Sequence, residues 1–248
     1  MAAGRIGTEI ASHRGGAILW PENSLLAFRQ ALSLPAEQLE IDVHLTADGE
    51  VAVIHDATLD RTTDGTGPVR AQPMAALRRL RLKGTDGEGV PGLAEVVALV
   101  KQAGRVLRLE IKADGTGRPY PGLVPACLAV LDAGGIRGRT VLMSFEPMTV
   151  AAAAAAGGFQ RLVLLMGSRP WHGMGPEGAI ALARACHAEE LGLTIADWDE
   201  ASVAALRDAG LGVSAWGTND ESSIRRGFAL GMDAIATDDP PLALRLRG

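Results

Sequence analysis

Residues 39–45 read Leu39-Glu40-Ile41-Asp42-Val43-His44-Leu45. Apolar and polar side chains alternate strictly in this run, and a period of two residues is typical of a β-strand. Leu39, Ile41 and Val43 therefore share one face, while Glu40 and Asp42 share the other. In a parallel sheet the apolar face is covered by helices. The run predicts a strand whose acidic face points into an interior.

Similar short apolar runs alternate with segments of helical spacing along the rest of the chain. The predicted strands are 9–13, 39–45, 106–111, 140–144, 161–165, 191–194, 212–215 and 234–237. The predicted helices are 24–34, 93–103, 123–133, 147–156, 177–188, 200–209, 221–230 and 241–246. This alternation indicates an α/β fold with a parallel sheet and crossover helices. About eight units in a chain of 248 residues predict a single (β/α)8 TIM barrel.

One stretch interrupts the alternation just after the second predicted strand. Residues 50–55 read as a further short strand after the turn at Asp48-Gly49, and residues 57–92 follow as a segment rich in Gly, Thr and Asp. We interpret 57–92 as a small excursion, or insertion, over one end of the barrel. No linker divides the chain, so residues 1–248 are predicted to form one barrel domain.

Charge and composition exclude several classes of partner. The chain has 24 Lys and Arg against 29 Asp and Glu, a net charge of −5, so it offers no general basic field for nucleic acid. Its longest apolar run, 150–159, is about half of the roughly 20 residues that a membrane span needs. We therefore expect a small-molecule partner and no integral membrane segment, with homo-oligomerisation left open.

Cysteine usage and the first residues indicate a cytoplasmic location. Cys127 and Cys186 lie far apart in apolar surroundings and match no metal-ligand spacing, which favours two buried free thiols over a disulfide. Residues 1–16 contain Arg5 and Glu9 and no apolar segment of the kind found in a secretory signal peptide.

Three acidic side chains are expected to meet where the second and third predicted strands end. Glu40 and Asp42 point to one face of their strand, and Glu110 shares a face with Lys112 on the next. In a barrel of this kind, functional groups lie at the carboxyl ends of the strands. Clustered carboxylates repel unless a cation lies among them, and oxygen ligands favour Mg²⁺ or Ca²⁺. We predict a site for one such ion.

Basic groups near this cluster indicate that the site takes a phosphate. Arg14 and Lys112 add positive charge, and Gly15-Gly16 allows close approach of backbone N–H groups to an anion. His13 and His55 come from different strands. They are suited to flank a phosphodiester, one as general base and the other as general acid.

These residues also place the chain near a known group of enzymes, because it resembles the glycerophosphodiester phosphodiesterase family. The resemblance rests on motifs that follow one another in order through nearly the whole chain: His13-Arg14-Gly15, Pro21-Glu22-Asn23-Ser24, Glu40-x-Asp42-Val43, Thr46-x-Asp48-Gly49, His55-Asp56, Arg61-Thr62-Thr63 with Gly65 and Gly67, Pro91-x-Leu93-x-Glu95, Glu110-x-Lys112, Ser144-Phe145, Trp216-x-x-Asn219 and Asp233-x-Ile235-x-Thr237-Asp238-x-Pro240. Departures from the family pattern are small and remove no chemical group; Ala36-Glu37-Gln38, for example, replaces a Gly-Ala-Asp run.

The resemblance implies a (β/α)8 barrel that, with a divalent metal, cleaves glycerophosphodiesters to glycerol 3-phosphate and an alcohol. It implies His13 and His55 as acid/base residues and Arg14 and Lys112 as phosphate contacts. It implies Glu40, Asp42 and Glu110 as the metal ligands. Two alternatives are a lysophospholipase D that acts on acylated substrates and a barrel that binds glycerophosphodiesters without turnover.

The sequence leaves two interpretations open for Asn23 and for Trp216. Asn23 is either a helix N-cap or a polar contact at the mouth, and Trp216 is either a plug of the barrel or an aromatic wall beside the substrate. The run Thr237-Asp238-Asp239 is expected to cap a helix, and His44 to be a hydrogen-bonded residue at a strand end. Residues 167–178, with Arg169, Trp171 and His172, are expected at the mouth, where they would contact the head group.

Overall fold

The computed structural model describes residues 7–248, and residues 1–6 of the predicted domain lie outside the described part. Nine strands form one sheet. The strands are β1 (Glu9–Ser12), β2 (Gln38–Leu45), β3 (Val51–Val53), β4 (Val106–Ile111), β5 (Thr140–Ser144), β6 (Arg161–Leu165), β7 (Glu190–Thr194), β8 (Gly212–Trp216) and β9 (Ala234–Thr237). All except β3 pair in parallel, and β1 pairs with both β2 and β9. The eight parallel strands therefore close into a barrel.

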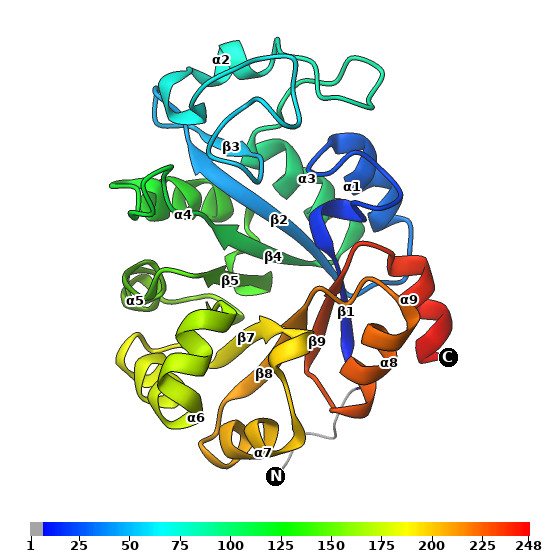
Figure 1. The fold of residues 1–248 in the computed structure, drawn as a ribbon. Helices are drawn as coiled ribbons and strands as arrows, with labels where there is room; N and C mark the ends of the chain where they lie inside the picture. Colours follow the sequence, from blue (N-terminus) through cyan, green and yellow to red (C-terminus); the bar gives the residue numbers. More distant parts are fainter. Residues whose placement is uncertain (1–6) are drawn as a thin grey trace.

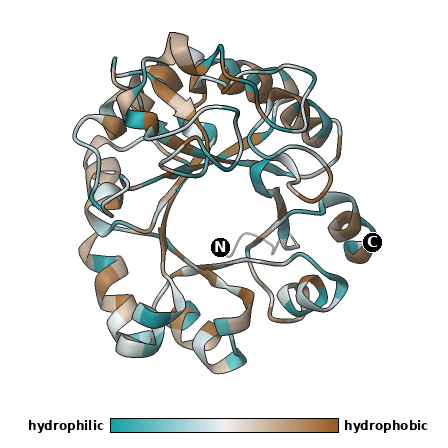
Figure 2. Ribbon diagram, turned by 45° about the horizontal axis from the view of Figure 1, so that its top comes forward, coloured by the Kyte–Doolittle hydropathy of each residue, from teal (hydrophilic) through white to brown (hydrophobic). Residues whose placement is uncertain are grey.

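Helices surround this barrel, as Figures 1 and 2 show. The helices are α1 (Leu25–Leu32), α2 (Met74–Leu77), α3 (Leu93–Ala103), α4 (Leu123–Gly134), α5 (Pro147–Ala156), α6 (Ser168–Ala185), α7 (Glu200–Asp208), α8 (Glu221–Ala229) and α9 (Pro240–Arg247). Short 3₁₀ turns are η1 (His13–Gly15), η2 (Val69–Ala71), η3 (Arg137–Arg139) and η4 (Ile195–Asp197). The predicted (β/α)8 TIM barrel is confirmed.

The alternation in β2 separates two environments. Leu39, Ile41 and Val43 are buried in the main apolar core between strands and helices. Glu40 and Asp42 are buried on the opposite face, inside the barrel. Burial of the apolar face stabilises the fold by roughly 25 cal/mol for each Å² removed from water.

The interior of the barrel is itself divided. On β4 and β7, Arg108 lies 2.7 Å from Glu190 and also donates to Ser214 at 2.9 Å. On β5 and β6, Val141, Met143, Val163 and Leu165 form a small apolar cluster against which Trp216 packs. The interior therefore contains a buried ion pair as well as an apolar cluster.

The excursion after the second strand has a small core of its own. β3 pairs antiparallel with β2 outside the barrel, as the turn at Asp48-Gly49 predicts. Residues 57–92 contain η2 and α2 and bury Leu59, Val69, Met74 and Leu77 against Ile54. The excursion lies over α3 and α1 in Figure 1. Packing of this kind gives β3 and the residues after it a fixed support.

The structure differs from the sequence-based expectation after β6. Helix α6 begins at Ser168, although residues 167–178 were expected to form a mouth loop. Gly175 has φ 63° and ψ −177°, so it breaks the helix, and Pro176 follows it. Because Gly and Pro have low helix propensity, the sequence does not predict the first turns of α6. Those turns are supported by Trp171, which is buried with its ring centroid 5.9 Å from that of Trp198.

Candidate active site

Three carboxylates meet inside the carboxyl end of the barrel. Parallel register places Asp42 of β2 directly beside Glu110 of β4, and Glu40 lies two residues earlier on the same face. One oxygen from each of the three lies within 4.8 Å of the others. Glu40 and Asp42 have no exposed surface, and Glu110 has 6%. The cluster predicted from strand parity is therefore present.

Two basic side chains accompany these acids. Lys112 Nζ lies 2.9 Å from Asp42 Oδ1 and 2.6 Å from Glu110 Oε1, and Arg14 Nε lies 3.2 Å from Asp42 Oδ2. Burial alone would raise the pKa of Asp42, but the charges of Lys112 and Arg14 outweigh it and hold that pKa well below its usual range. Asp42 is therefore ionised throughout the physiological range.

Glu40 has the opposite tendency. Complete burial and the neighbouring charge of Asp42 raise the pKa of Glu40 to about 7. Its Oε2 accepts from the backbone N–H of Arg14 at 2.8 Å, whereas its Oε1 is buried without a hydrogen-bond partner. An unpartnered buried carboxylate oxygen is costly unless a cation binds it. The three oxygen donors and this free atom fit a hard divalent cation.

His13 reaches the cluster from η1, directly after β1. Its Nδ1 lies 2.6 Å from Asp238 Oδ1, and its Nε2 lies 3.9 Å from Glu40 Oε2. Burial lowers the pKa of His13, but the charge of Glu40 and the hydrogen bond to Asp238 outweigh this effect and raise that pKa overall. Asp238 thus orients the ring so that Nε2 faces Glu40.

Asp238 was not identified as a site residue by sequence reasoning. The run Thr237-Asp238-Asp239 was expected to cap a helix, and Asp239 does cap α9, with its Oδ1 accepting from Leu242 N at 2.9 Å. Asp238 is instead fixed by Asn219, which donates to Asp238 Oδ2 at 2.7 Å and accepts from its backbone N–H at 2.8 Å. The family motifs Trp216-x-x-Asn219 and Thr237-Asp238 were the available signal.

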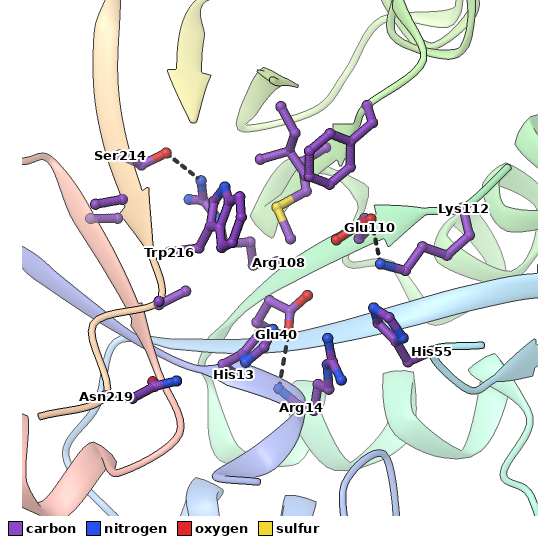
Figure 3. A pocket seen from close by; sticks show the side chains of 17 residues that line it. His13, Arg14, Glu40, His55, Arg108, Glu110, Lys112, Ser214, Trp216 and Asn219 are labelled. Atoms are coloured by element: carbon purple, nitrogen blue, oxygen red, sulfur yellow. Dashed lines mark hydrogen bonds and ion pairs between the residues drawn. The ribbon is translucent and has the colours of Figure 1, made fainter. Parts of the chain in front are cut away.

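His55 has a carboxylate partner of its own. It lies two residues beyond the end of β3, and its Nδ1 is 2.7 Å from Asp56 Oδ1. Arg61, from the excursion, donates from Nε to Asp56 Oδ2 at 2.7 Å and from Nη1 to Glu22 Oε2 at 2.7 Å. In Figure 3, His55 and His13 enter the cavity from different elements, with Arg14 between them. The site therefore contains two His–Asp pairs.

The loop between β1 and α1 is strained where it supports the site. Arg14 and Asn23 have φ of 51° and 53°, values that non-glycine residues rarely adopt. Gly15 has φ +85°, and a Cβ at this position would lie 2.8 Å from Ala27 Cβ. Strain of this kind is concentrated at functional sites. Here it aims the N–H and side chain of Arg14 at Glu40 and Asp42.

Asn23 has neither of the two roles expected for it, a helix N-cap or a polar contact at the mouth. Ser24, rather than Asn23, caps α1, because Ser24 Oγ accepts from Ala27 N at 3.0 Å. Asn23 is buried and donates from Nδ2 to Asp42 Oδ2 at 2.9 Å. It does not line the cavity, because it lies behind the carboxylate of Asp42. Its amide holds that carboxylate in place.

The cavity has a volume of about 340 Å³ and extends from the acids to an apolar wall. Trp216 and Phe145 line that wall, with ring centroids 6.4 Å apart and an interplanar angle of 74°. Figure 3 shows Trp216 on the opposite side of the cavity from His55 and Lys112. Arg108 and Ser214 also line the cavity. Trp216 therefore lines the cavity, and its contact with the substrate stays a prediction.

The residues expected to contact a head group do not line this cavity. Trp171 is buried against Trp198, and the exposed side chain of His172 lies with its Nε2 3.4 Å from Asp197 Oδ1. Neither these two nor Arg169 is among the lining residues. These residues were expected to form a loop at the mouth, but residues 168–174 form a helix that turns the side chain of Trp171 into the core.

Two other expectations can be compared with the described residues. Cys127 and Cys186 are buried free thiols, as predicted. None of the helices within residues 7–248 combines the length and the apolar character that crossing a bilayer requires.

Comparison with known proteins agrees with this geometry. Residues 13–242 match the glycerophosphoryl diester phosphodiesterase family. A glycerophosphodiester phosphodiesterase of Caldanaerobacter subterraneus is 28% identical over 247 residues, covering 96% of this chain and 97% of that protein.

Solved structures share the whole fold. A crystal structure of a putative glycerophosphoryl diester phosphodiesterase from Agrobacterium tumefaciens has a TM-score of 0.94 and 31% identity, covering 98% of each chain. The phosphodiesterase of Oleispira antarctica, solved in complex with the product sn-glycerol-3-phosphate, has a TM-score of 0.86 and 26% identity, covering 96% of each chain. The match extends over more than nine-tenths of the sequence, from His13 to the last helix, so the chain belongs to the glycerophosphoryl diester phosphodiesterase family.

Proposed function

We propose that this enzyme hydrolyses glycerophosphodiesters to glycerol 3-phosphate and an alcohol, with one bound Mg²⁺ or Ca²⁺. The observation that carries the proposal is the convergence of three buried carboxylates and two His–Asp pairs at one cavity. Membership of the family and the product complex of the Oleispira antarctica relative support the same activity.

Glu40, Asp42 and Glu110 are the proposed metal ligands. The buried Oε1 of Glu40 has no other partner, and Asp42 Oδ1 contacts only Lys112. When bound, the ion would act as a Lewis acid on a phosphoryl oxygen. Asn23 and the backbone N–H of Arg14 hold two of the ligands in position. An all-oxygen donor set fits either Mg²⁺ or Ca²⁺.

Arg14 and Lys112 are the proposed phosphate contacts. Both line the cavity, and both already face carboxylates. Their charge offsets the developing charge on the phosphoryl oxygens in the transition state. Arg14 is also anchored to Glu22 at 3.2 Å, which restrains its guanidinium.

His13 and His55 are the proposed acid/base pair. Asp238 and Asp56 each accept from Nδ1 of their histidine, so that each Nε2 is the atom available to exchange a proton. One histidine takes the proton of the attacking hydroxyl, whether from water or from the glycerol part of the substrate. The other donates a proton to the leaving alcohol.

The remaining arm of the diester is proposed to lie against Trp216 and Phe145. Both rings line the cavity and meet edge to face. Neither the lysophospholipase D alternative nor the non-catalytic barrel is favoured, since the relatives are named glycerophosphodiester phosphodiesterases. The cytoplasmic location stays a prediction from cysteine usage and the first residues, and homo-oligomerisation stays open.

The activity is tested by incubating the purified protein with choline, ethanolamine and inositol glycerophosphodiesters and measuring glycerol 3-phosphate enzymatically. We expect release that stops in excess EDTA and returns with added Mg²⁺ or Ca²⁺. The variants Glu40→Gln, Asp42→Asn and Glu110→Gln should need more metal and turn over more slowly. Glu221→Gln, on the exposed face of α8, is the matched control. Full turnover in EDTA by metal-free protein would refute the metal role.

A further inference from the structure

His44 is a buried polar residue that has no role in the site as described so far. It lies on β2, two residues after Asp42, and only 1% of its surface is exposed. Both of its ring nitrogens have partners. Nδ1 lies 2.8 Å from Tyr120 Oη, and Nε2 lies 2.9 Å from the backbone carbonyl oxygen of His55.

These partners fix which nitrogen carries the proton. A carbonyl oxygen only accepts, so Nε2 must donate to His55. In the neutral ring Nδ1 is then an acceptor, and the hydroxyl of Tyr120 must donate to it. Burial raises the pKa of Tyr120 to about 12, so its hydroxyl keeps the proton that it donates to His44. Tyr120 therefore donates a hydrogen bond to His44, and His44 donates one to the backbone of His55.

His55 needs such support because it is not part of a strand. β3 ends at Val53, and the last backbone hydrogen bond to β2 is made by Ile54, which donates to Asp42 O at 3.0 Å. Beyond Ile54, the next hydrogen bond between β2 and this segment is the one from the side chain of His44 to the backbone carbonyl of His55. Asp56 holds the ring of His55, whereas His44 holds its backbone.

Tyr120, the first residue in this series of hydrogen bonds, is itself held in place by its neighbours. Its ring meets that of His44 edge-on, at 5.7 Å between centroids and 85° between planes. The guanidinium of Arg70, from η2 of the excursion, lies 6.0 Å from the centroid of the Tyr120 ring, and Arg70 pairs with Asp114 at 3.1 Å. Residues from the excursion and from the segment after β4 therefore converge on His44.

We propose that His44 is a positioning residue for catalysis, which acts by holding the backbone of His55 through its Nε2–H. The inference rests on the proposed acid/base role of His55. A general base or acid must lie within hydrogen-bond reach of the proton that it moves. A shift of about 1 Å in a catalytic group can cost on the order of 10²-fold in rate. Loss of this one hydrogen bond should therefore lower kcat.

A matched pair of amides tests the proposal. The side-chain nitrogen of Gln at position 44 reaches the place of Nε2, while the polar atoms of Asn reach only the place of Nδ1. His44→Gln keeps the donor to His55, and His44→Asn keeps an acceptor for Tyr120. We expect His44→Asn to lower kcat by about 10- to 100-fold with little change in KM, and His44→Gln to retain most of the wild-type kcat.

Controls separate positioning from a general loss of structure. Both variants bury an amide, so their melting temperatures should fall by similar amounts. The metal concentration for half-maximal rate should stay unchanged, although Asp42 is close. Equal kcat for the two variants, a loss confined to KM, or a loss reversed by saturating metal would overturn the proposal.

A double-mutant cycle then links the effect to His55. In a His55→Ala background, adding His44→Asn should cause no further loss of kcat, because the group that His44 positions is gone. An additive loss would show that His44 acts elsewhere. If His55→Ala alone kept its rate, the acid/base assignment of His55 would fail instead. The two failures are therefore distinguishable.

Discussion

His13 Nδ1 lies 2.6 Å from Asp238 Oδ1, although 225 positions separate the two residues in the chain. They meet because β1 and β9 pair with Ser12 opposite Thr237, so the residue that follows each strand faces its counterpart across this seam. Asn219 fixes the other oxygen of the same carboxylate. The half-buried His13 is thereby given one tautomer and one orientation.

The first prediction concerns this carboxylate. Asp238→Asn should lower kcat, because an amide no longer stabilises the protonated ring of His13 or fixes its tautomer. The loss should be smaller than the roughly 10²- to 10⁴-fold that removal of a general acid or base causes. Steady-state kinetics on glycerophosphocholine measure it. Asp239→Asn is the control, since Asn caps a helix as well as Asp does. Unchanged kcat in Asp238→Asn would remove Asp238 from the site.

The second prediction assigns the two histidines. His13→Ala and His55→Ala should each lower kcat by about 10²- to 10⁴-fold on unactivated glycerophosphodiesters. On a diester with an activated aryl alcohol, the variant that lacks the general acid should recover much of its rate, because that leaving group needs little protonation. The other variant should not recover. Comparison of kcat on the two substrates decides the roles, and near-normal rates for both variants would contradict the pair.

The third prediction uses the pKa of Glu40, which burial and Asp42 raise from 4.5 to about 7. Between these two pH values the folded, metal-free protein keeps a proton on Glu40 that the unfolded chain has released. The folded state then binds more protons, so its free energy of unfolding should decrease as pH rises through this window. The slope from this one group is at most about 1.4 kcal/mol per pH unit.

Denaturant titrations of metal-free protein between pH 4.5 and pH 7 would measure the effect. The quantity to compare is the difference between wild type and Glu40→Gln, since groups away from this site titrate equally in both. That difference should shrink when saturating Mg²⁺ is present, because the ion takes the place of the proton. A difference that is flat across the window would show that Glu40 is ionised in the metal-free fold.

The fourth prediction concerns the aromatic wall. Trp216→Ala and Phe145→Ala should change the ratios of kcat/KM among choline, ethanolamine and inositol diesters, because they remove surface beside one arm of the substrate. Met148→Ala, at a residue that is 72% exposed and does not line the cavity, is the control. A uniform decrease with constant ratios would mean that the wall does not distinguish the alcohols.

Local patterns were sufficient to predict the barrel and its acidic cluster. The two-residue period at 39–45 places Glu40 and Asp42 inside, and the parallel register of β2 and β4 then brings Glu110 beside Asp42. Both relationships depend on residues that are near one another in a strand or on neighbouring strands. They are therefore accessible from spacing and from knowledge of how parallel strands align.

Relationships between distant segments were not accessible in this way. The partner of His13 comes from across the β1–β9 seam, and Asp238 resembled a helix cap because Asp239, its neighbour, is one. Trp171 was expected at the mouth because Gly and Pro concealed the helix that turns it toward Trp198. In each case a tertiary contact overrode what the local composition indicated.

The seam between β1 and β9 also has a consequence for folding. Strands β5 to β8 pair only with the strands next to them in chain order, whereas β1 finds its second neighbour only when β9 has formed. Strands that are far apart in the sequence pair late or slowly in many proteins. A partly folded chain would already hold Asp42 beside Glu110 but would leave His13 without its carboxylate. The carboxylate partner of His13 is therefore in place only once the ring of strands is complete.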